Sequence, residues 1–459
     1  MSAAAGQRPP RREPGAREAA PARAVAARVL ERVETDGAFA DLALTAELRR
    51  RPLQVRDVAL ATELIFGTLR WQRYLDWILA PHSRRRLPAL DPRVRVLLRL
   101  TAYQLAFLER VPAFAAVNDA VTLARGAPGV AEYVNAVLRA FARRGAAERE
   151  PALPRDPLEA LATRCSFPTW LAARWLARYG AEEAEALMRA LNERAPLTVR
   201  ANTVRTTREA LATRLREDDG LQARATPLAP EGLVVEGGGD PGRWRAFVEG
   251  LCVLQDEASM LVARLLEPAA GTTIADVCAA PGTKTTHLAQ LMDNRGRVLA
   301  FDPQAARLAR VGEQAARLGV TIAETVEGAV ETLAPRWAGA CDGVLVDAPC
   351  SNLGVLRRNP EVKWRRQPAD VAAAGERQRG ILAAAAGLVR PGGRLVYATC
   401  SLEPEENDDV ARDFLAARPE FTVEPPAACP VTPDAAGFVR CLPHRHGTDG
   451  FTAIRFRRA

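Results

Sequence analysis

Short apolar runs alternate with helical segments through the chain from residue 251 onward. The runs occupy residues 273–277, 297–301, 320–323, 342–346 and 394–397. Runs of this length are typical of strands that are buried on both faces of a parallel sheet. Their alternation with helices predicts a doubly wound α/β domain, Rossmann-like in architecture, over residues 251–459. Such domains bind ligands outside the carboxyl ends of their strands, so the residues after each run are candidate site residues.

The remaining chain predicts two further domains, because 459 residues exceed one ordinary hydrophobic core. Apolar residues recur at helical spacing through residues 21–146, which predicts an all-α domain. Residues 156–250 contain a helical stretch around 170–192, then the segment 197–202, a second helix and a short strand at 232–236, an order that predicts a small α+β connecting domain. Residues 1–20 are rich in Arg, Pro, Ala and Gly, so we expect a disordered tail there.

The charge balance is basic, with 63 Lys and Arg residues against 55 Asp and Glu residues and a net charge of +8. Arginine greatly outnumbers lysine, which suits contact with phosphate groups. A solvated basic surface has the same composition. Charge alone therefore favours a nucleic-acid partner only weakly.

The cysteines form no disulfide framework and no C-x-x-C pair, so we expect reduced thiols. They stand at positions 165, 252, 278, 341, 350, 400, 429 and 441. Cys429, Cys441, His444 and His446 lack the spacing of a zinc site, and we expect no bound metal. The chain shows neither the apolar core of a signal peptide nor an apolar span of about 18 residues, so we expect a soluble, cytoplasmic protein without membrane contact.

The turn after the first run predicts a nucleoside site. Its residues are Cys278, Ala279, Ala280, Pro281, Gly282, Thr283 and Lys284. A tight Pro-Gly turn lets backbone N–H groups approach a ligand at a helix N-terminus. Asp302 ends the next run, where a carboxylate can accept both ribose hydroxyls, and Glu327 follows the third run, within expected reach of an adenine. Neither G-x-G-x-x-G nor P-loop spacing is present, which favours S-adenosylmethionine over a dinucleotide.

Two later runs end in turns that contain cysteine. The strings are Asp347-Ala348-Pro349-Cys350-Ser351 and Ala398-Thr399-Cys400-Ser401. An isolated cysteine is more often a small buried hydrophobic residue than a nucleophile. Because both of these follow predicted parallel strands, they are expected at the ligand-binding edge of the sheet. The pattern indicates chemistry that uses sulfur.

These strings, together with Pro391-Gly392-Gly393 and Asp449-Gly450-Phe451, resemble the ordered motifs of RNA cytosine-C5 methyltransferases. Residues 63–77, 117–121 and 134–139 resemble the helical RNA-binding domain of the antitermination factor NusB. With residues 357–364 added, the chain from residue 21 onward is similar to the bacterial RsmB (Sun, Fmu) family, which modifies a cytosine in small-subunit ribosomal RNA. Thr283 departs from the family, which usually has a second glycine there, and threonine adopts the glycine-only backbone region at a cost, so the loop conformation and the cofactor affinity stay open at this point.

The resemblance implies S-adenosylmethionine-dependent methylation of cytosine C5 in 16S rRNA, in naked or early-assembly form, by a monomer. It implies that Cys400 attacks C6 and that Cys350 helps to release the adduct. The chemistry is consistent, because C5 is a poor nucleophile until a thiolate adds to C6. DNA cytosine methyltransferases instead use the cysteine of their Pro-Cys pair, so the choice between Cys400 and Cys350 depends on the resemblance.

Other side chains have expected roles around these cysteines. A free thiol is only a few per cent thiolate at neutral pH, so we expect a positive or donor-rich environment, with Lys284 as a source. Asp347 is expected to hydrogen-bond or protonate N3 of the ring and to lie near the cofactor. The basic cluster of Arg357, Arg358, Lys363, Trp364, Arg365 and Arg366 can hold phosphates and stack a base, although a solvated basic face fits equally well.

Alternative functions stay open at this point. The same chemistry can act on a transfer RNA or on another ribosomal cytosine. A non-catalytic RNA-binding or antitermination protein that keeps a methyltransferase fold is a second class, although two motif cysteines argue against it. Methylation of a base amine expects an Asn/Asp-Pro-Pro-aromatic motif, which Asp347-Ala348-Pro349-Cys350 does not match.

Overall fold

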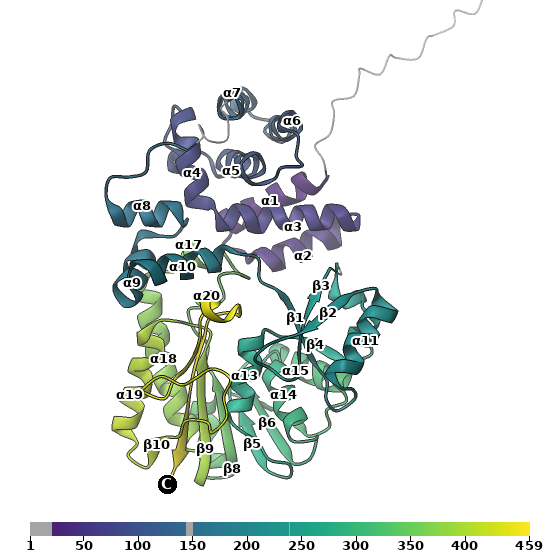
Figure 1. The fold of residues 1–459 in the computed structure, drawn as a ribbon, viewed down its shortest axis with the longest axis vertical. Coiled ribbons are helices and arrows are strands. Elements are labelled where there is room, and N and C mark those ends of the chain that lie inside the picture. The colour runs from purple at the N-terminus through teal and green to yellow at the C-terminus, as the bar shows by residue number, and fades with distance from the viewer. Residues whose placement is uncertain (1–20, 144–149, 238) are drawn as a thin grey trace, which may run out of the picture. The chain divides into compact units, whose positions relative to one another are not determined.

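A computed structural model describes residues 21–143, 150–237 and 239–459 (Figure 1). The chain divides into two compact units, Met1–Ser166 and Phe167–Ala459. The tail predicted at residues 1–20 lies outside the described residues. None of the helices in the described ranges combines the length and the hydropathy that crossing a lipid bilayer requires.

The first unit is all-α, as the sequence predicts. Its helices are α1 (Pro21–Thr35), α2 (Ala40–Arg50), α3 (Val55–Arg70), α4 (Gln72–Leu79), α5 (Pro92–Phe107), α6 (Ala113–Leu123), α7 (Val130–Ala142) and α8 (Pro157–Arg164). The central helix is α5, which contacts α1, α3, α4, α6 and α7. Its N-terminus is fixed by Asp91, whose carboxylate accepts from the Arg93 N–H at 2.9 Å.

The boundary between the units lies later than predicted. Helix α8 was assigned to the connecting domain, which was expected to begin at residue 156, but it belongs to the first unit. The Ser166 hydroxyl accepts from the backbone N–H of Arg73 at 3.1 Å, and Arg73 Nε donates to Thr163 Oγ1 at 3.1 Å. These contacts join α8 to the start of α4, and no local sequence pattern reveals them.

The second unit begins with α9 (Thr169–Tyr179) and α10 (Ala181–Asn192), followed by a small antiparallel sheet. Its strand order is β2 (Gln222–Ala225), β3 (Gly232–Glu236), β1 (Leu197–Ala201) and β4 (Cys252–Leu254), and it packs against α11 (Arg208–Asp219) and α12 (Arg245–Val248). The predicted small α+β fold is confirmed. The sheet extends beyond the boundary predicted at residue 250, because Ala201 pairs with Cys252.

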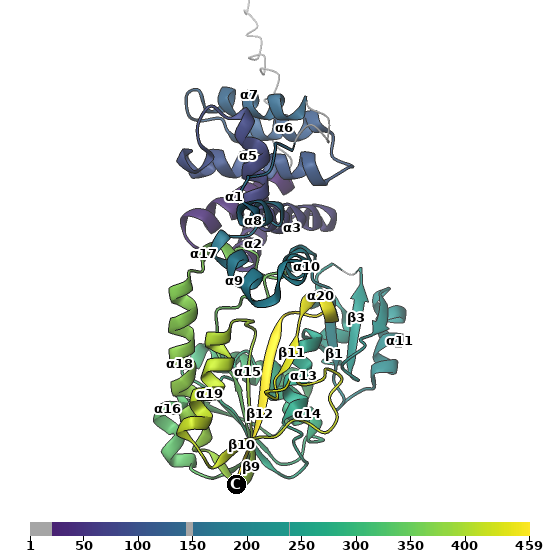
Figure 2. The same cartoon turned by 60° about the vertical axis from the view of Figure 1, so that its left-hand side comes forward.

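The larger sheet confirms the doubly wound α/β fold (Figure 2). Its order is β10 (Phe421–Val423), β12 (Phe451–Arg458), β9 (Val389–Thr399), β8 (Cys341–Asp347), β5 (Thr273–Asp276), β6 (Arg297–Asp302) and β7 (Ala323–Glu327), with β11 (Val439–Cys441) paired to β12. Strands β5 to β9 are parallel, whereas β12 runs antiparallel to β9. The larger sheet therefore combines a parallel centre with an antiparallel edge.

Helices cover both faces of this sheet (Figures 1 and 2). One face packs against α16 (Val330–Leu333), α18 (Pro368–Ala386) and α19 (Asp408–Ala417), and the other packs against α13 (Glu257–Leu265), α14 (Thr283–Leu291) and α15 (Ala305–Leu318). Neighbouring residues of β5 show the division, because Ala275 lies in the first of these cores and Ile274 in the second. Short helices α17 (Val362–Arg365) and α20 (Pro443–His446) complete the unit.

The third parallel strand differs from its prediction. The apolar run at 320–323 is mostly a connection, and β7 instead covers Ala323–Glu327. This strand is the edge of the sheet, where Glu324 is exposed and pairs with Arg297 at 2.7 Å. Edge strands have less buried surface than central strands. A search for apolar runs therefore misplaces this element.

A buried arginine links the small sheet to the first strand-helix turn of the larger one. Arg200, on β1, donates to the Thr283 carbonyl at 2.8 Å and to Gln290 Oε1 at 2.9 Å, and its side chain is fully buried. We predict that Arg200→Met lowers the free energy of unfolding by roughly 2–4 kcal/mol, because these buried acceptors lose their donor. Urea unfolding of Arg224→Met, which changes an exposed arginine on β2, is the control and should shift by less than about 0.5 kcal/mol.

A second prediction concerns Asp276, the buried last residue of β5. Burial, with the nearby charge of Asp347, raises the pKa of Asp276 to about 7. The folded chain then holds a proton that the unfolded chain releases above about pH 4, so stability falls as pH rises from about 4 to 7. The Asp276→Asn variant lacks this loss. Its stability relative to the wild type should rise by roughly 2 kcal/mol between pH 5 and pH 8, and an unchanged difference across this range would contradict the assignment.

Candidate active site

The carboxyl ends of the parallel strands bring together the residues that the motifs indicate. Strand β5 ends at Asp276, β6 at Asp302, β7 at Glu327 and β8 at Asp347, while Cys400 directly follows β9. Strand register places Asp302 opposite Glu327 and Asp347 opposite Ala398. The edge predicted to bind a ligand therefore presents carboxylates and a thiol.

A cavity of about 310 Å³ lies at this edge. The turn residues that line it are Cys278, Ala279, Ala280, Pro281, Thr283 and Lys284, and Asp347, Cys400, Arg358, Asp449 and Phe451 line it as well. The segment that connects the small sheet to α13 adds Gln255 and Asp256, and α13 itself adds Ser259. Cys350, Asp302 and Glu327 are not among the lining residues. The cavity thus corresponds to the reaction end of the predicted site.

In the turn at residues 278–284, Gly282 takes a left-handed backbone conformation and Thr283 takes a helical one. Gly282 has a φ of 99°, and a Cβ at this position would lie 3.0 Å from the Val311 Cα, so glycine is required. Thr283 instead begins helix α14 with helical backbone. The left-handed position therefore falls on Gly282, and Thr283 does not need the glycine-only backbone region. The first N–H groups of α14 remain directed toward the turn.

Lys284 and Asp347 form an ion pair on the cavity wall. Lys284 Nζ lies 2.6 Å from Asp347 Oδ2 and donates to Ser259 Oγ at 2.9 Å. The same ammonium group lies 5.1 Å from the centroid of the Phe451 ring. The pair places a proton donor and an acceptor side by side, next to an aromatic face.

The two motif cysteines are adjacent. Their sulfur atoms lie 3.1 Å apart, and Cys400 Sγ donates to Asn352 Oδ1 at 2.9 Å. The hydrogen bond with Cys350, burial and the charge of Asp347 raise the pKa of the Cys400 thiol, and Lys284 opposes this only in part. Lys284 acts on this thiol in the predicted direction, but its ion pair with Asp347 limits the effect. Its role as the source of a thiolate-stabilising environment stays a prediction.

Asn352 is a site residue that the sequence analysis missed. It has a φ of 64°, a left-handed conformation that asparagine tolerates better than most residues. Its Oδ1 also lies 3.7 Å from Cys350 Sγ, so one amide contacts both thiols. Its position two residues after Cys350 is the only sequence signal, and that signal does not distinguish it from an ordinary turn residue.

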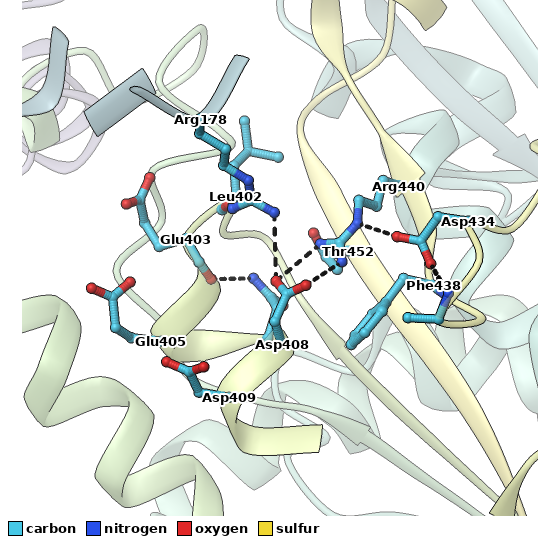
Figure 3. A network of polar contacts seen from close by, with 12 residues as sticks. Arg178, Leu402, Glu403, Glu405, Asp408, Asp409, Asp434, Phe438, Arg440 and Thr452 are labelled. Atoms are coloured by element: carbon cyan, nitrogen blue, oxygen red, sulfur yellow. Dashed lines mark hydrogen bonds and ion pairs between the residues drawn. The ribbon is translucent and has the colours of Figure 1, made fainter. Parts of the chain in front are cut away.

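Helix α9 holds the segment that follows Cys400. Arg174 Nε donates to Glu403 Oε2 at 2.6 Å, and Trp175 Nε1 donates to Glu403 Oε1 at 2.8 Å. Figure 3 shows the neighbouring part of this network, where Asp408 lies between Arg178 and Arg440. More than two hundred residues separate these partners in the sequence, so no local motif predicts the contact. The network fixes the loop between β9 and α19.

Two members of the basic cluster are buried. Arg357 is 5% exposed and donates to the Gly447 carbonyl at 2.8 Å, while Lys363 is 1% exposed and donates to Asn192 Oδ1 at 2.8 Å. Both groups bind acceptors inside the unit, so their placement does not support the predicted role as phosphate contacts, which stays a prediction. Trp364, Arg365 and Arg366 are half-buried, and their role as an RNA contact stays a prediction.

Arg358 belongs to the cavity wall rather than to an outer basic face. It pairs with Asp256 at 3.0 Å and also with Asp449. Burial, with the charge of Asp256, raises the pKa of Asp449 to about 6. Two carboxylates thus neutralise Arg358, and a phosphate group would have to compete with both of them.

Asp302 and Glu327 lie beside the cavity, at the same edge of the sheet. Asp302 is buried, and its Oδ1 accepts from the Gln304 N–H at 3.0 Å. Glu327 is exposed on β7. Their predicted contacts with a ribose and an adenine stay predictions, consistent with their neighbouring positions.

The two histidines near the end of the chain have protein partners. His444 Nε2 lies 2.8 Å from Glu183 Oε2, and His446 Nδ1 accepts from the Leu442 N–H at 2.9 Å. Throughout the part of the chain that the structure describes, no three His, Cys, Asp or Glu side chains are grouped as a metal ion would need.

Known families match successive parts of the chain. The NusB family matches residues 20–143, and the ferredoxin-like domain of RsmF/B-like methyltransferases matches residues 167–240. The family described as 16S rRNA methyltransferase RsmB/F matches residues 263–457. The three matches follow the order of the all-α unit, the small antiparallel sheet and the larger sheet.

Two solved structures resemble the chain. The crystal structure of PH0851 has a TM-score of 0.82 and 29% identity, and the match covers 96% of this chain and 99% of that one. NSun6 from Pyrococcus horikoshii with SFG has a TM-score of 0.58 and 26% identity, over 64% of this chain and 98% of that one.

Related sequences extend over nearly the whole length. The probable ribosomal RNA small subunit methyltransferase B of Bacillus subtilis (strain 168) is 36% identical over 451 residues, which cover 95% of this chain and 98% of the relative. The ribosomal RNA small subunit methyltransferase B of Sodalis glossinidius (strain morsitans) is 36% identical over 94% of this chain and 96% of the relative. Since identity at this level covers both chains almost completely, the protein belongs to the ribosomal RNA small subunit methyltransferase B family.

Proposed function

We propose that the protein uses S-adenosylmethionine to methylate C5 of a cytosine in 16S rRNA through a covalent adduct with Cys400. The observation that carries the proposal is the pair of thiols 3.1 Å apart, with Cys400 on the wall of a cavity beside Lys284 and Asp347. The names of the related small-subunit methyltransferases support the substrate. Carbon methylation without a redox cofactor requires such a nucleophile, whereas an amine target does not.

The strand ends fit the proposed cofactor. Gly282 leaves space that a Cβ would fill, α14 begins directly after it, and Asp302 and Glu327 stand on the next two strands. We assign the turn at residues 278–284, Asp302, Glu327 and Asp347 to cofactor binding. When bound, S-adenosylmethionine supplies an electrophilic methyl group.

The chain's own residues would carry the remaining steps. The Cys400 thiol passes its proton to the Lys284–Asp347 pair as its sulfur forms a bond to C6, and the C5–C6 π electrons then make C5 nucleophilic. Asp347 hydrogen-bonds or protonates N3 as this adduct forms, and Lys284, 2.6 Å away, can replace the proton. After methyl transfer, the C5 proton leaves with the help of Cys350, the C5–C6 double bond re-forms and Cys400 is expelled. A proximal thiol pair serves both halves of this sequence.

The substrate must leave its stack before this chemistry, because both faces of the ring take part. A cytosine in a loop, or one that is flipped out, satisfies this requirement. We propose 16S rRNA in naked or early-assembly form as the partner of a monomer. The all-α unit, which matches the NusB family, is the proposed second RNA contact.

Methyl transfer is the first prediction from this proposal. Tritium from labelled S-adenosylmethionine should enter an unmethylated 16S rRNA transcript as 5-methylcytosine, and Cys400→Ala should lower the rate by at least ~10³-fold. Cys429→Ala, which changes a cysteine outside the cavity, should retain the wild-type rate. Labelling of transfer RNA but not of 16S rRNA would assign the activity to transfer RNA instead. Absence of both cofactor binding and methyl transfer would exclude an enzymatic function.

Alanine variants of the two cysteines should behave differently in an assay for the covalent adduct. We expect Cys350→Ala to accumulate a denaturation-resistant complex with RNA, because release is impaired, and Cys400→Ala to form none. Gel mobility of labelled RNA under denaturing conditions measures the complex. The reverse pattern would exchange the two roles.

A further inference from the structure

A buried carboxylate connects the turn that contains Cys350 to the turn that contains Cys400. Glu406 ends a short turn of 3₁₀ helix between β9 and α19, and its side chain is fully buried. Ser351 and Ser401, which directly follow the two cysteines, both donate their hydroxyl protons to Glu406 Oε2. One oxygen atom therefore joins the residue after Cys350 to the residue after Cys400.

The other oxygen of Glu406 is also held. Its Oε1 accepts from the backbone N–H of Ser351 at 2.7 Å and from Gln378 Nε2 at 3.2 Å. Gln378, on α18, donates in addition to the Pro349 carbonyl at 2.9 Å, immediately before Cys350. The backbone carbonyl of Glu406 accepts from the Tyr397 hydroxyl at 2.5 Å. The carboxylate is thus fixed to β9, α18 and the Cys350 turn together.

The use of a carboxylate at this position needs a reason, since burial of a charge is costly. The described partners of its side chain are neutral donors rather than a lysine or arginine. A carboxylate accepts only, so it can bind both serine hydroxyls and a backbone N–H at once, which an amide or an apolar side chain cannot do. Charge-assisted hydrogen bonds are short and directional, and they fix geometry more firmly than packing does.

We propose that Glu406 is a positioning residue that sets the separation of the Cys350 and Cys400 sulfur atoms. Its side chain is not among those that line the cavity. It acts through Ser351 and Ser401, which hold the two turns at the distance that lets both thiols reach one base. This role deepens the proposed function and rests on it for its purpose, although the geometric claim can be tested without RNA.

The test without substrate uses phenylarsine oxide, which condenses with two neighbouring thiols to form two As–S bonds and releases one water. We expect the wild type to bind one equivalent across Cys350 and Cys400, identified by protection of both from alkylation. Glu406→Gln should bind at least tenfold more weakly. Asp409→Asn, which changes a nearby carboxylate that pairs with Arg412 on α19, is the matched control and should bind as the wild type does.

A second variant guards against loss of folding in Glu406→Gln. The double change Ser351→Ala and Ser401→Ala keeps the carboxylate but removes both hydroxyl links, and it should weaken arsenical binding by a similar factor. Unchanged affinity in a folded Glu406→Gln, or in the serine pair variant if the former does not fold, would overturn the proposal.

The steady-state kinetics of methyl transfer then test whether the positions of the two thiols affect the reaction. Glu406→Gln should lower kcat at least tenfold while KM for RNA and the affinity for S-adenosylmethionine stay within twofold, because the cofactor turn is not altered. A rise in KM with kcat unchanged would contradict a positioning role. If the wild type transfers no methyl group to RNA, the proposed function fails, and the arsenical series still decides whether Glu406 sets the thiol pair.

Discussion

The site depends on the parallel pairing of β8 with β9. Their register places Asp347 opposite Ala398, so the turns that carry Cys350 and Cys400 leave the sheet at the same edge. Main-chain hydrogen bonds fix this register along the buried centre of the sheet, where a slip would move apolar side chains to the wrong face. The 3.1 Å separation of the two sulfur atoms follows from this pairing and from the links between the turns.

Charged side chains at this edge of the sheet form ion pairs with side chains of opposite charge. Lys284 pairs with Asp347, and Arg358 pairs with both Asp256 and Asp449. Burial raises the pKa of Asp276 and contributes to the raised pKa of the Cys400 thiol, so both groups hold their protons more firmly than they would at an open surface.

The smaller parts of the second unit support the chemistry mechanically. Arg200 extends from the antiparallel sheet to the carbonyl of Thr283, and α9 binds Glu403 in the loop after Cys400. The turn at residues 278–284 and the loop after Cys400 are therefore each held by an element outside the larger sheet. Buried polar links of this kind are costly unless every partner is satisfied, but they define one arrangement. The connecting domain is thus part of the site's framework.

The sequence by itself determined the doubly wound fold, the all-α first unit, the strand ends that carry the site and the choice of Cys350 and Cys400. These features come from local periodicity, from motifs that are each only a few residues long, and from the family resemblance that the motifs carry. Only the tertiary structure decided the state of the Cys400 thiol, the burial of Arg357 and Lys363, the extent of β7, and the roles of Asn352 and Glu406. Those properties arise from contacts between distant segments, and a basic or acidic residue type does not reveal whether its charge faces solvent, a partner or the core.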